Sequence, residues 1–171
     1  MVVAVILAAG FSTRLGTSKQ DIVFEGETLV QRAERLARAV ADNVIVVTPQ
    51  LNPDAAEGIA SSIRVGVRMA GNDARILIML CDQPLITIEH LLYLIATASP
   101  IAATGYAGIA GVPAVFAPEF ASELLALRGD RGARAVIEAH RDVVRVVPFE
   151  DAAVDIDSED DLRKFTATYR S

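Results

Sequence analysis

The chain has 171 residues, and its 16 basic and 22 acidic side chains give a formal net charge of −6. Hydrophobic residues make up 52% of it and charged residues 22%, which is enough apolar surface to offset the entropy of ordering and excludes a disordered chain. The acidic balance argues against a nucleic-acid or membrane binder, but a small anionic ligand held by a few local cations fits. The length predicts one domain over residues 1–171. A single cysteine, Cys81, fits a reducing, cytoplasmic setting.

Strand and helix patterns alternate along the chain. Apolar runs typical of strands covered on both faces occupy residues 2–7, 44–47 and 75–81. Weaker strand patterns lie at residues 101–106, 112–116 and 143–147, and the last of them leads into a final strand at 154–157.

Helical spacing of apolar residues fills the intervals. Capping side chains, a proline and the end of a glycine-rich break indicate helix starts at Thr28, at Ser61 or Ser62, at Thr87, Pro118, Ala133 and Ser158. This alternation predicts an α/β three-layer, Rossmann-like domain with a mostly parallel sheet. Ligands of such sheets bind at the carboxyl ends of the strands.

The strongest chemical signal begins where the first strand ends, in residues 7–20, LAAGFSTRLGTSKQ. Five residues separate Gly10 from Gly16 and Lys19 follows three later, so this is neither a Walker loop nor a dinucleotide fingerprint. Glycines let the backbone approach phosphates, and Arg14 and Lys19 bring two cations together, as a triphosphate cradle needs. Taken alone, the segment could also be an ordinary βα turn with solvated Arg14 and Lys19.

Acidic side chains are expected at the same edge of the sheet. Asp82 follows the third apolar strand in the motif CDQP, while Asp155 and Asp157 share a face of the last strand. Because magnesium binds through one or two carboxylates plus substrate phosphates, this pattern predicts Mg²⁺ held by Asp82 with Asp157 or Asp155. Taken singly, Asp82 could begin a turn and Asp157 could cap a helix.

Six ordered motifs resemble those of MobA-like nucleotidyltransferases, above all the molybdopterin cytidylyltransferases. They are LAAGFSTRLGTSKQ, GIASSIRVGV, CDQP, GVPAVF, GDRGAR and DIDSEDDL, which begin at residues 7, 58, 81, 111, 129 and 155. The resemblance implies a nucleotide-diphospho-sugar transferase fold. It also implies a Mg²⁺ enzyme of molybdenum cofactor biosynthesis, with a molybdoenzyme as a possible partner. Such an enzyme transfers a nucleotidyl group from a nucleoside triphosphate to a phosphorylated acceptor such as molybdopterin and releases pyrophosphate, and Ala9 favours CTP.

The resemblance also implies the site residues. For nucleotide binding these are Leu7, Ala8, Ala9, Gly10, Arg14, Lys19, Ser61, Ser62 and Arg64. The catalytic residues are Arg14, Lys19 and Asp82, the metal ligands are Asp82, Asp157 and Asp155, and the acceptor residues are Gly111, Pro113 and Arg131. An acceptor phosphate is already ionised at neutral pH, so no histidine or cysteine base is required.

Two alternatives remain open. The same loop and carboxylates serve sugar- or polyol-phosphate nucleotidyltransferases. A non-catalytic nucleotide- or cofactor-binding relative is the other alternative. The ten residues between Val47 and Gly58 favour it, because relatives usually place a further helix and strand there.

Overall fold

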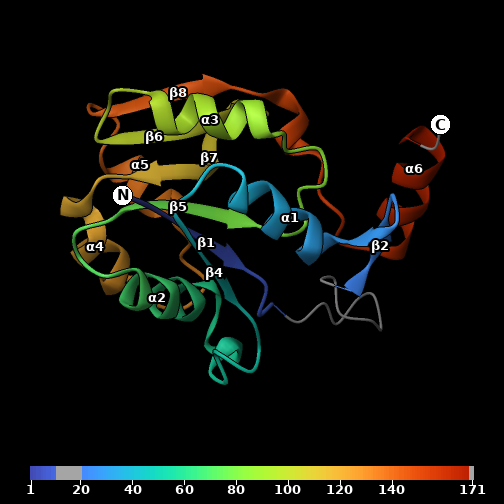
Figure 1. The fold of residues 1–171 in the computed structure, drawn as a ribbon, viewed down its shortest axis with the longest axis horizontal. Helices are drawn as coiled ribbons and strands as arrows, with labels where there is room; N and C mark the ends of the chain where they lie inside the picture. The colour runs from blue at the N-terminus through green and yellow to red at the C-terminus, as the bar shows by residue number, and fades with distance from the viewer. Residues whose placement is uncertain (11–20, 170–171) are drawn as a thin grey trace.

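A computed structural model describes residues 1–10 and 21–169 and has a six-stranded sheet at its centre (Figure 1). The order is β4-β1-β5-β7-β6-β8, with β7 antiparallel to both neighbours and every other pair parallel. The sheet consists of β1 (Val2–Leu7), β4 (Asn43–Val47), β5 (Arg75–Leu80), β6 (Ile101–Tyr106), β7 (Ile109–Phe116) and β8 (Val144–Pro148). The predicted α/β architecture with a mostly parallel sheet is confirmed.

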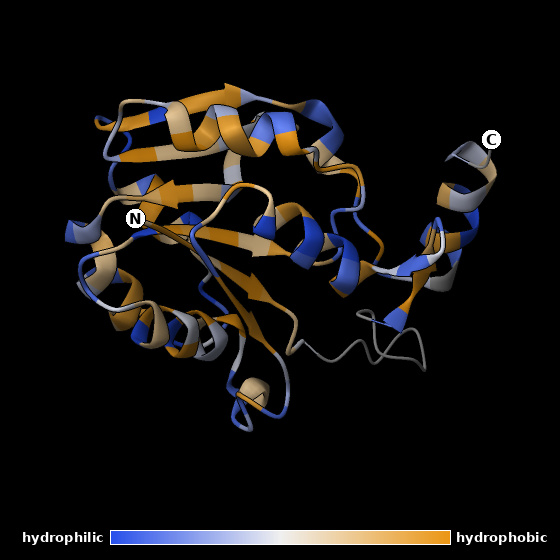
Figure 2. Ribbon diagram, viewed as in Figure 1, coloured by the Kyte–Doolittle hydropathy of each residue, from blue (hydrophilic) through white to orange (hydrophobic). Residues whose placement is uncertain are grey.

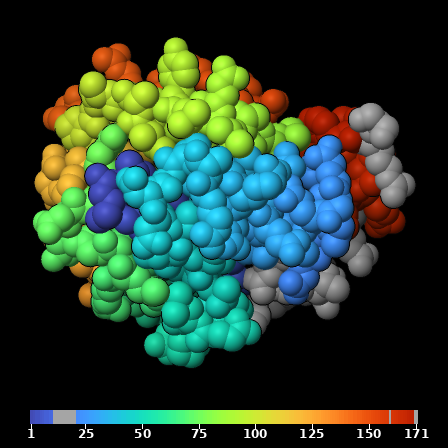
Figure 3. All heavy atoms as spheres, viewed as in Figure 1, coloured from blue at the N-terminus to red at the C-terminus, as the bar shows by residue number. Residues whose placement is uncertain are grey.

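Helices cover both faces of this sheet. On one face α1 (Leu29–Arg38) and α3 (Ile88–Ala96) pack over one buried apolar cluster. On the other face α2 (Ile59–Ala70), α4 (Ala121–Ala126) and α5 (Arg134–Ala139) pack over a second cluster. Figure 2 shows the apolar strands between these helix layers, and in Figure 3 the side chains of α1 and α3 cover much of this face. Burial on both sides explains the uninterrupted apolar runs of β1 and β5.

A small module stands at one end of the molecule (Figure 1). The hairpin of β2 (Val23–Phe24) and β3 (Glu27–Thr28) packs against α6 (Glu159–Tyr169), with 4.6 Å between the ring centroids of Phe24 and Phe165. Short 3-10 turns complete the fold at η2 (Ala55–Glu57), η3 (Pro118–Phe120) and η4 (Glu150–Ala153). None of the helices described here is long and apolar enough to cross a bilayer.

The helix starts show where local sequence sufficed. Thr28 caps α1 in a capping box with Gln31, and Thr87 caps α3, as predicted. The prediction for α2 was wrong, because this helix begins at Ile59 after Gly58, and both serines lie inside it. Gly58 has φ +123°, a conformation that only glycine adopts without strain, and it therefore fixes the start of the helix.

The expected last strand at 154–157 was also wrong. These residues form no strand and follow η4, attached to the sheet edge by the Ile156 N–H, which donates to the Asp82 carbonyl at 3.2 Å. The alternation of apolar and acidic residues comes from a buried Ile156 between more exposed aspartates. One inward side chain therefore produced a strand-like pattern without a strand.

Candidate functional site

A cavity of about 490 Å³ opens at the carboxyl edge of the sheet, a volume in the range of small-molecule sites. Four segments that are distant in sequence meet there: the end of β1, η2 with the start of α2, the end of β5, and the loop before α5. The lining residues are Leu7, Ala8, Ala9, Gly10, Ala55, Ala56, Gly58, Ile59, Ser62, Leu80, Cys81, Asp82 and Asp130. The ten residues between Val47 and Gly58, where relatives were expected to have a further helix and strand, thus still form one wall of the cavity through Ala55 and Ala56.

The end of β1 supplies backbone to this cavity. The Ala8 N–H continues the strand by donating to the Val47 carbonyl at 2.9 Å, and Ala8 and Ala9 are buried while Gly10 is exposed. Small side chains here leave the main chain open to a ligand. Arg14 and Lys19, the predicted cations, lie outside the described residues.

A buried amide organises the start of α2. Asn52 donates from Nδ2 to Ser61 Oγ at 2.8 Å and to Ser62 Oγ at 2.9 Å, and Ser61 in turn donates to the Gly58 carbonyl at 2.9 Å. Ser62 lines the cavity, and its hydroxyl, an acceptor for Asn52, keeps a proton to donate to a ligand. Asn52 was not predicted, because its only local signal is the Asn-Pro pair typical of turns.

Arg64, a predicted nucleotide-binding residue, does not face the cavity. Its guanidinium donates to the Leu127 carbonyl at 2.8 Å and to Glu57 at 2.6 Å, and it is not among the residues that line the cavity. Its hydrogen bond is the main cause that lowers the pKa of Glu57. Arg64 therefore joins η2, α2 and the end of α4 behind the cavity wall.

The predicted carboxylates gather at the same edge. Asp82 lines the cavity, and the backbone bond from Ile156 brings the 155–157 segment to it. Partial burial of its carboxyl, the hydrogen bond with Asp157 and repulsion from Asp157 and Asp82 raise the pKa of Asp155 to about 6. Asp157 and Asp82 therefore stand close enough to disfavour the ionisation of Asp155.

This donor set fits a divalent cation shared with a substrate. Within residues 1–10 and 21–169, no three His, Cys, Asp or Glu side chains are arranged to hold a metal unaided. Magnesium does not need such a cage, because it accepts one or two carboxylates and completes its shell with phosphates and water. Carboxylate oxygens from Asp82 and from Asp155 or Asp157 match that requirement.

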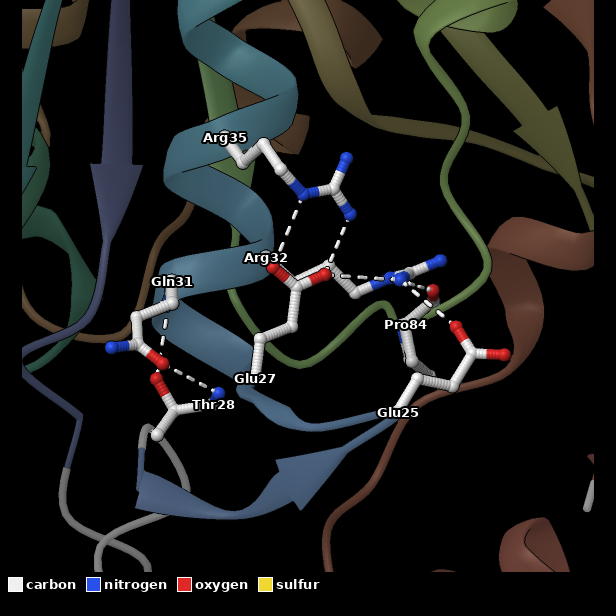
Figure 4. A network of polar contacts seen from close by, with 7 residues as sticks. All are labelled: Glu25, Glu27, Thr28, Gln31, Arg32, Arg35 and Pro84. Atoms are coloured by element: carbon white, nitrogen blue, oxygen red, sulfur yellow. Dashed lines mark hydrogen bonds and ion pairs between the residues drawn. The ribbon is translucent and has the colours of Figure 1, made fainter.

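The loop that carries Asp82 is anchored from both sides. In Figure 4 Arg32 donates from Nε to the Pro84 carbonyl at 2.8 Å and reaches Glu25 and Glu27, each at 3.3 Å. Arg35 in the same figure binds only Glu27 of this group, at 2.6 Å. The side chain of Arg32 is only 18% exposed, and it joins the hairpin to the Asp82 loop.

Gln83 forms the second anchor. Its Nε2 donates to the Val112 carbonyl at 3.1 Å and to the Ala152 carbonyl at 3.0 Å, so it connects the loop to β7 and η4. Gln83 belongs to the CDQP motif, but the motif alone does not reveal this anchoring role, because the partners of Gln83 are distant in sequence.

The predicted acceptor residues are separated. Gly111 and Pro113 are buried in β7, and the Pro113 carbonyl accepts from the Thr104 hydroxyl at 2.6 Å. Arg131 is exposed in the loop before α5, next to Asp130, which lines the cavity. None of the three lines the 490 Å³ cavity itself.

Residues 4–144 match the family of MobA-like NTP transferase domains. The purine catabolism protein PucB of Bacillus subtilis (strain 168) is 30% identical over a 166-residue alignment that covers 80% of each protein. The solved structure of Rv0371c from Mycobacterium tuberculosis H37Rv is 29% identical, with a TM-score of 0.84 over 97% of each chain. A manganese complex of Rv0371c is 26% identical, with a TM-score of 0.78 over 98% of each chain.

Proposed function

We propose a specific nucleotidyl-transfer reaction, from the premise that the chain belongs to the family of MobA-like NTP transferase domains. A nucleotidyl group, CMP favoured, passes from a nucleoside triphosphate to a phosphorylated small acceptor, and pyrophosphate is released. The observation that supports this reaction is the 490 Å³ cavity, where the backbone after β1, the start of α2 and Asp82 meet.

The cavity suits a nucleotide in two ways. Ala55, Ala56 and Ile59 offer apolar contact to a base, while the start of α2 and the Ser62 hydroxyl favour anionic oxygens. Leu7 to Gly10 supply backbone groups to the same ligand. Arg14 and Lys19 are proposed to bind the triphosphate, and Arg64 acts by holding the wall in place.

The proposed chemistry is an in-line displacement. An oxygen of the acceptor phosphate attacks the α-phosphorus and forms a new P–O bond, while the bond from the α-phosphorus to the bridging oxygen breaks and pyrophosphate leaves with the electron pair. The attacking oxygen is already ionised, so positioning and electrostatics supply the catalysis. No side chain of the chain becomes covalently attached.

Asp82, with Asp157 or Asp155, is proposed to hold Mg²⁺. When bound, a divalent ion neutralises charge on the triphosphate oxygens. The manganese complex of the similar Rv0371c protein supports the use of a divalent ion. The chain's own contribution is to fix the carboxylates through Arg32, Gln83 and the Ile156 backbone bond.

The acceptor is proposed to lie beside β7 and the loop before α5, near Gly111, Pro113 and Arg131. Molybdopterin is the acceptor that the sequence motifs favour, with a molybdoenzyme as the recipient of the product. A sugar or polyol phosphate would use the same edge of the sheet.

Pyrophosphate release with CTP, GTP and UTP, with and without Mg²⁺ and with a panel of phosphorylated acceptors, tests the proposal. We expect Asp82→Asn to lower turnover by about 100-fold or more while the melting temperature stays near that of the wild type. Asp73→Asn, an exposed acidic residue in the turn after α2, is the matched control and keeps full activity. Equal turnover by Asp82→Asn and the wild type would remove Asp82 from the reaction.

A further inference from the structure

A carboxylate other than Asp82 lines the 490 Å³ cavity. Asp130 contributes it from the loop before α5, whereas Asp82 stands at the end of β5. Asp82 lies beside the 155–157 segment, where Mg²⁺ is proposed to bind. Metal binding and phosphate transfer make no use of Asp130, so its place on the cavity wall points to a different part of the ligand.

The loop that carries Asp130 is fixed against the start of α2. The Arg131 N–H donates to the Arg128 carbonyl at 3.3 Å, which closes a tight turn. Gly129 within this turn has φ +62°, and its carbonyl accepts the Ala60 N–H from the first turn of α2 at 3.1 Å. These backbone bonds hold the loop without help from the Asp130 side chain.

The Asp130 side chain lies over the start of α2. An added Cβ at Gly58 would come within 2.6 Å of Asp130 Oδ1, and one at Gly132 would lie 3.7 Å from Ile59 Cγ2. The loop therefore packs on Ile59, which also lines the cavity. This brings the carboxylate next to the apolar wall of η2 and Ile59 that is proposed to contact the base.

The charge of Asp130 is not used inside the protein. Within residues 1–10 and 21–169, its carboxylate has no ion pair or side-chain hydrogen bond. The neighbouring Glu57 differs, because the Arg64 guanidinium pairs with it at 2.6 Å. Asp130 is also exposed, so both carboxylate oxygens are accessible to a ligand. A carboxylate only accepts hydrogen bonds and repels phosphate, so the group that it binds must be a donor.

We propose that Asp130 selects the base of the nucleotide, because its carboxylate accepts a hydrogen bond from the 4-amino group of cytosine. Acidic side chains recognise this amino group in nucleic acids. Uracil has an oxygen at the same position, which would face the carboxylate with no proton between them. This inference rests on the proposed function and names the residue that makes it prefer CTP to UTP. Adenine and guanine also carry amino groups, so Asp130 decides between the two pyrimidines only.

The ribose hydroxyls are the other donors that a nucleotide offers. The base fits the position of Asp130 better, because the carboxylate stands beside an apolar wall, where burying a ring is more favourable than burying a sugar. A contact with the ribose would also be the same for every nucleoside triphosphate. Comparison of two nucleotides that differ only in the base therefore distinguishes the two contacts.

Titration calorimetry with α,β-methylene analogues of CTP and UTP, in the presence of Mg²⁺, tests the assignment, since these analogues cannot undergo the transfer. We expect the wild type to bind the CTP analogue at least about 10-fold more tightly than the UTP analogue. Asp130→Asn keeps an acceptor and adds a donor for the uracil oxygen. This variant is expected to weaken the CTP analogue, to strengthen the UTP analogue and to lower the preference about 10-fold or more.

The gain for UTP separates recognition from damage, because a distorted loop would weaken both analogues. Asp130→Ala, which can neither accept nor donate, is expected to bind the CTP analogue as weakly as the UTP analogue. Asp54→Asn is the matched control. Asp54 is exposed at the start of η2, forms no side-chain capping bond and does not line the cavity, so this variant loses the same charge and keeps the wild-type preference.

The outcomes keep this inference separate from the proposed function. Failure of the wild type to bind either analogue would contradict the function itself. Equal affinity of the wild type for the two analogues would overturn only the role of Asp130. The same holds if Asp130→Asn left the preference unchanged, or if it weakened both analogues equally, as loss of a ribose contact would.

Discussion

Two buried polar networks support the carboxyl edge of the sheet, one on each side of Asp82. On the proposed nucleotide side, Asn52 holds Ser61 and Ser62 and thereby fixes the start of α2. Every group in that network is an amide, a hydroxyl or a backbone carbonyl. None of these groups changes its charge across the pH range in which proteins are studied.

The network on the other side, the proposed acceptor side beside β6 and β7, contains an imidazole. His90 Nε2 lies 2.8 Å from the Thr104 hydroxyl, and Thr104 gives its only proton to the Pro113 carbonyl. His90 must then donate from Nε2, which fixes a neutral tautomer, and its ring stacks on Phe149 at 4.3 Å. Burial lowers the pKa of His90 to about 4. The β6–β7 hairpin that carries Tyr106 therefore depends on a group that acid can charge, whereas the nucleotide side does not.

The largest expected effect on stability comes from Gly58, on the proposed nucleotide side. An added Cβ at Gly58 would overlap the Gly129 carbonyl, and its φ of +123° is strained for any other residue. We expect Gly58→Ala to lower the free energy of unfolding by about 3 kcal/mol or more and to weaken CTP binding. Gly71→Ala, at the other end of α2, carries positive φ but open space, so a loss of about 1 to 2 kcal/mol measures strain alone. Urea unfolding distinguishes the two, and equal losses would refute the overlap.

Lowering the pH is expected to destabilise the side that contains His90 and not the side that contains Asn52. Because the folded pKa of His90 is about 4 and the unfolded value about 6.5, the unfolded chain takes up the proton first as the pH falls. The free energy of unfolding is expected to fall by about 3 kcal/mol between pH 6.5 and pH 4 from this group. His90→Gln keeps a donor for Thr104 and removes that slope, while His140→Gln retains it. Hydrogen exchange at pH 5 should open the β6–β7 hairpin before α2, and simultaneous opening would contradict the contrast.

A smaller effect tests the uncharged network. Asn52→Ala removes the donor shared by two buried hydroxyls and is expected to cost about 2 kcal/mol of unfolding free energy, with the same loss at pH 5 and pH 7. The exposed Asn72→Ala variant is the control and leaves stability unchanged. A loss that grew markedly in acid would show that this side also contains a titrating group.

The smallest expected effect concerns Arg32, which anchors the Asp82 loop between the two networks. Arg32→Met removes the bond to the Pro84 carbonyl and the contacts with Glu25 and Glu27, for an expected loss of about 1 to 2 kcal/mol and several-fold slower turnover. Arg35→Met breaks a pair with the same Glu27 but no bond to the Asp82 loop, so turnover should stay at the wild-type rate. Thermal unfolding and pyrophosphate release measure both, and identical turnover by the two variants would contradict an anchoring role for Arg32.

Local sequence was enough for the elements whose cause is local. The apolar runs of β1 and β5, the Thr28 and Thr87 caps and the position of Asp82 after a buried strand were all predicted, because periodicity and capping act within a few residues. The roles of the cations at Arg14 and Lys19 stay predictions, since they lie outside the described residues.

Tertiary structure decided the rest, because the deciding partners are distant in the chain. Ser62 lies inside α2 rather than at its cap because Gly58 packs against Gly129, some seventy residues on. Asp155 lies near Asp82 through a single backbone bond rather than a strand. By itself the sequence determined which residues could build a nucleotide site at this edge. Long-range packing determined which of them meet there, since burial and hydrogen bonds across the sheet have no local signature.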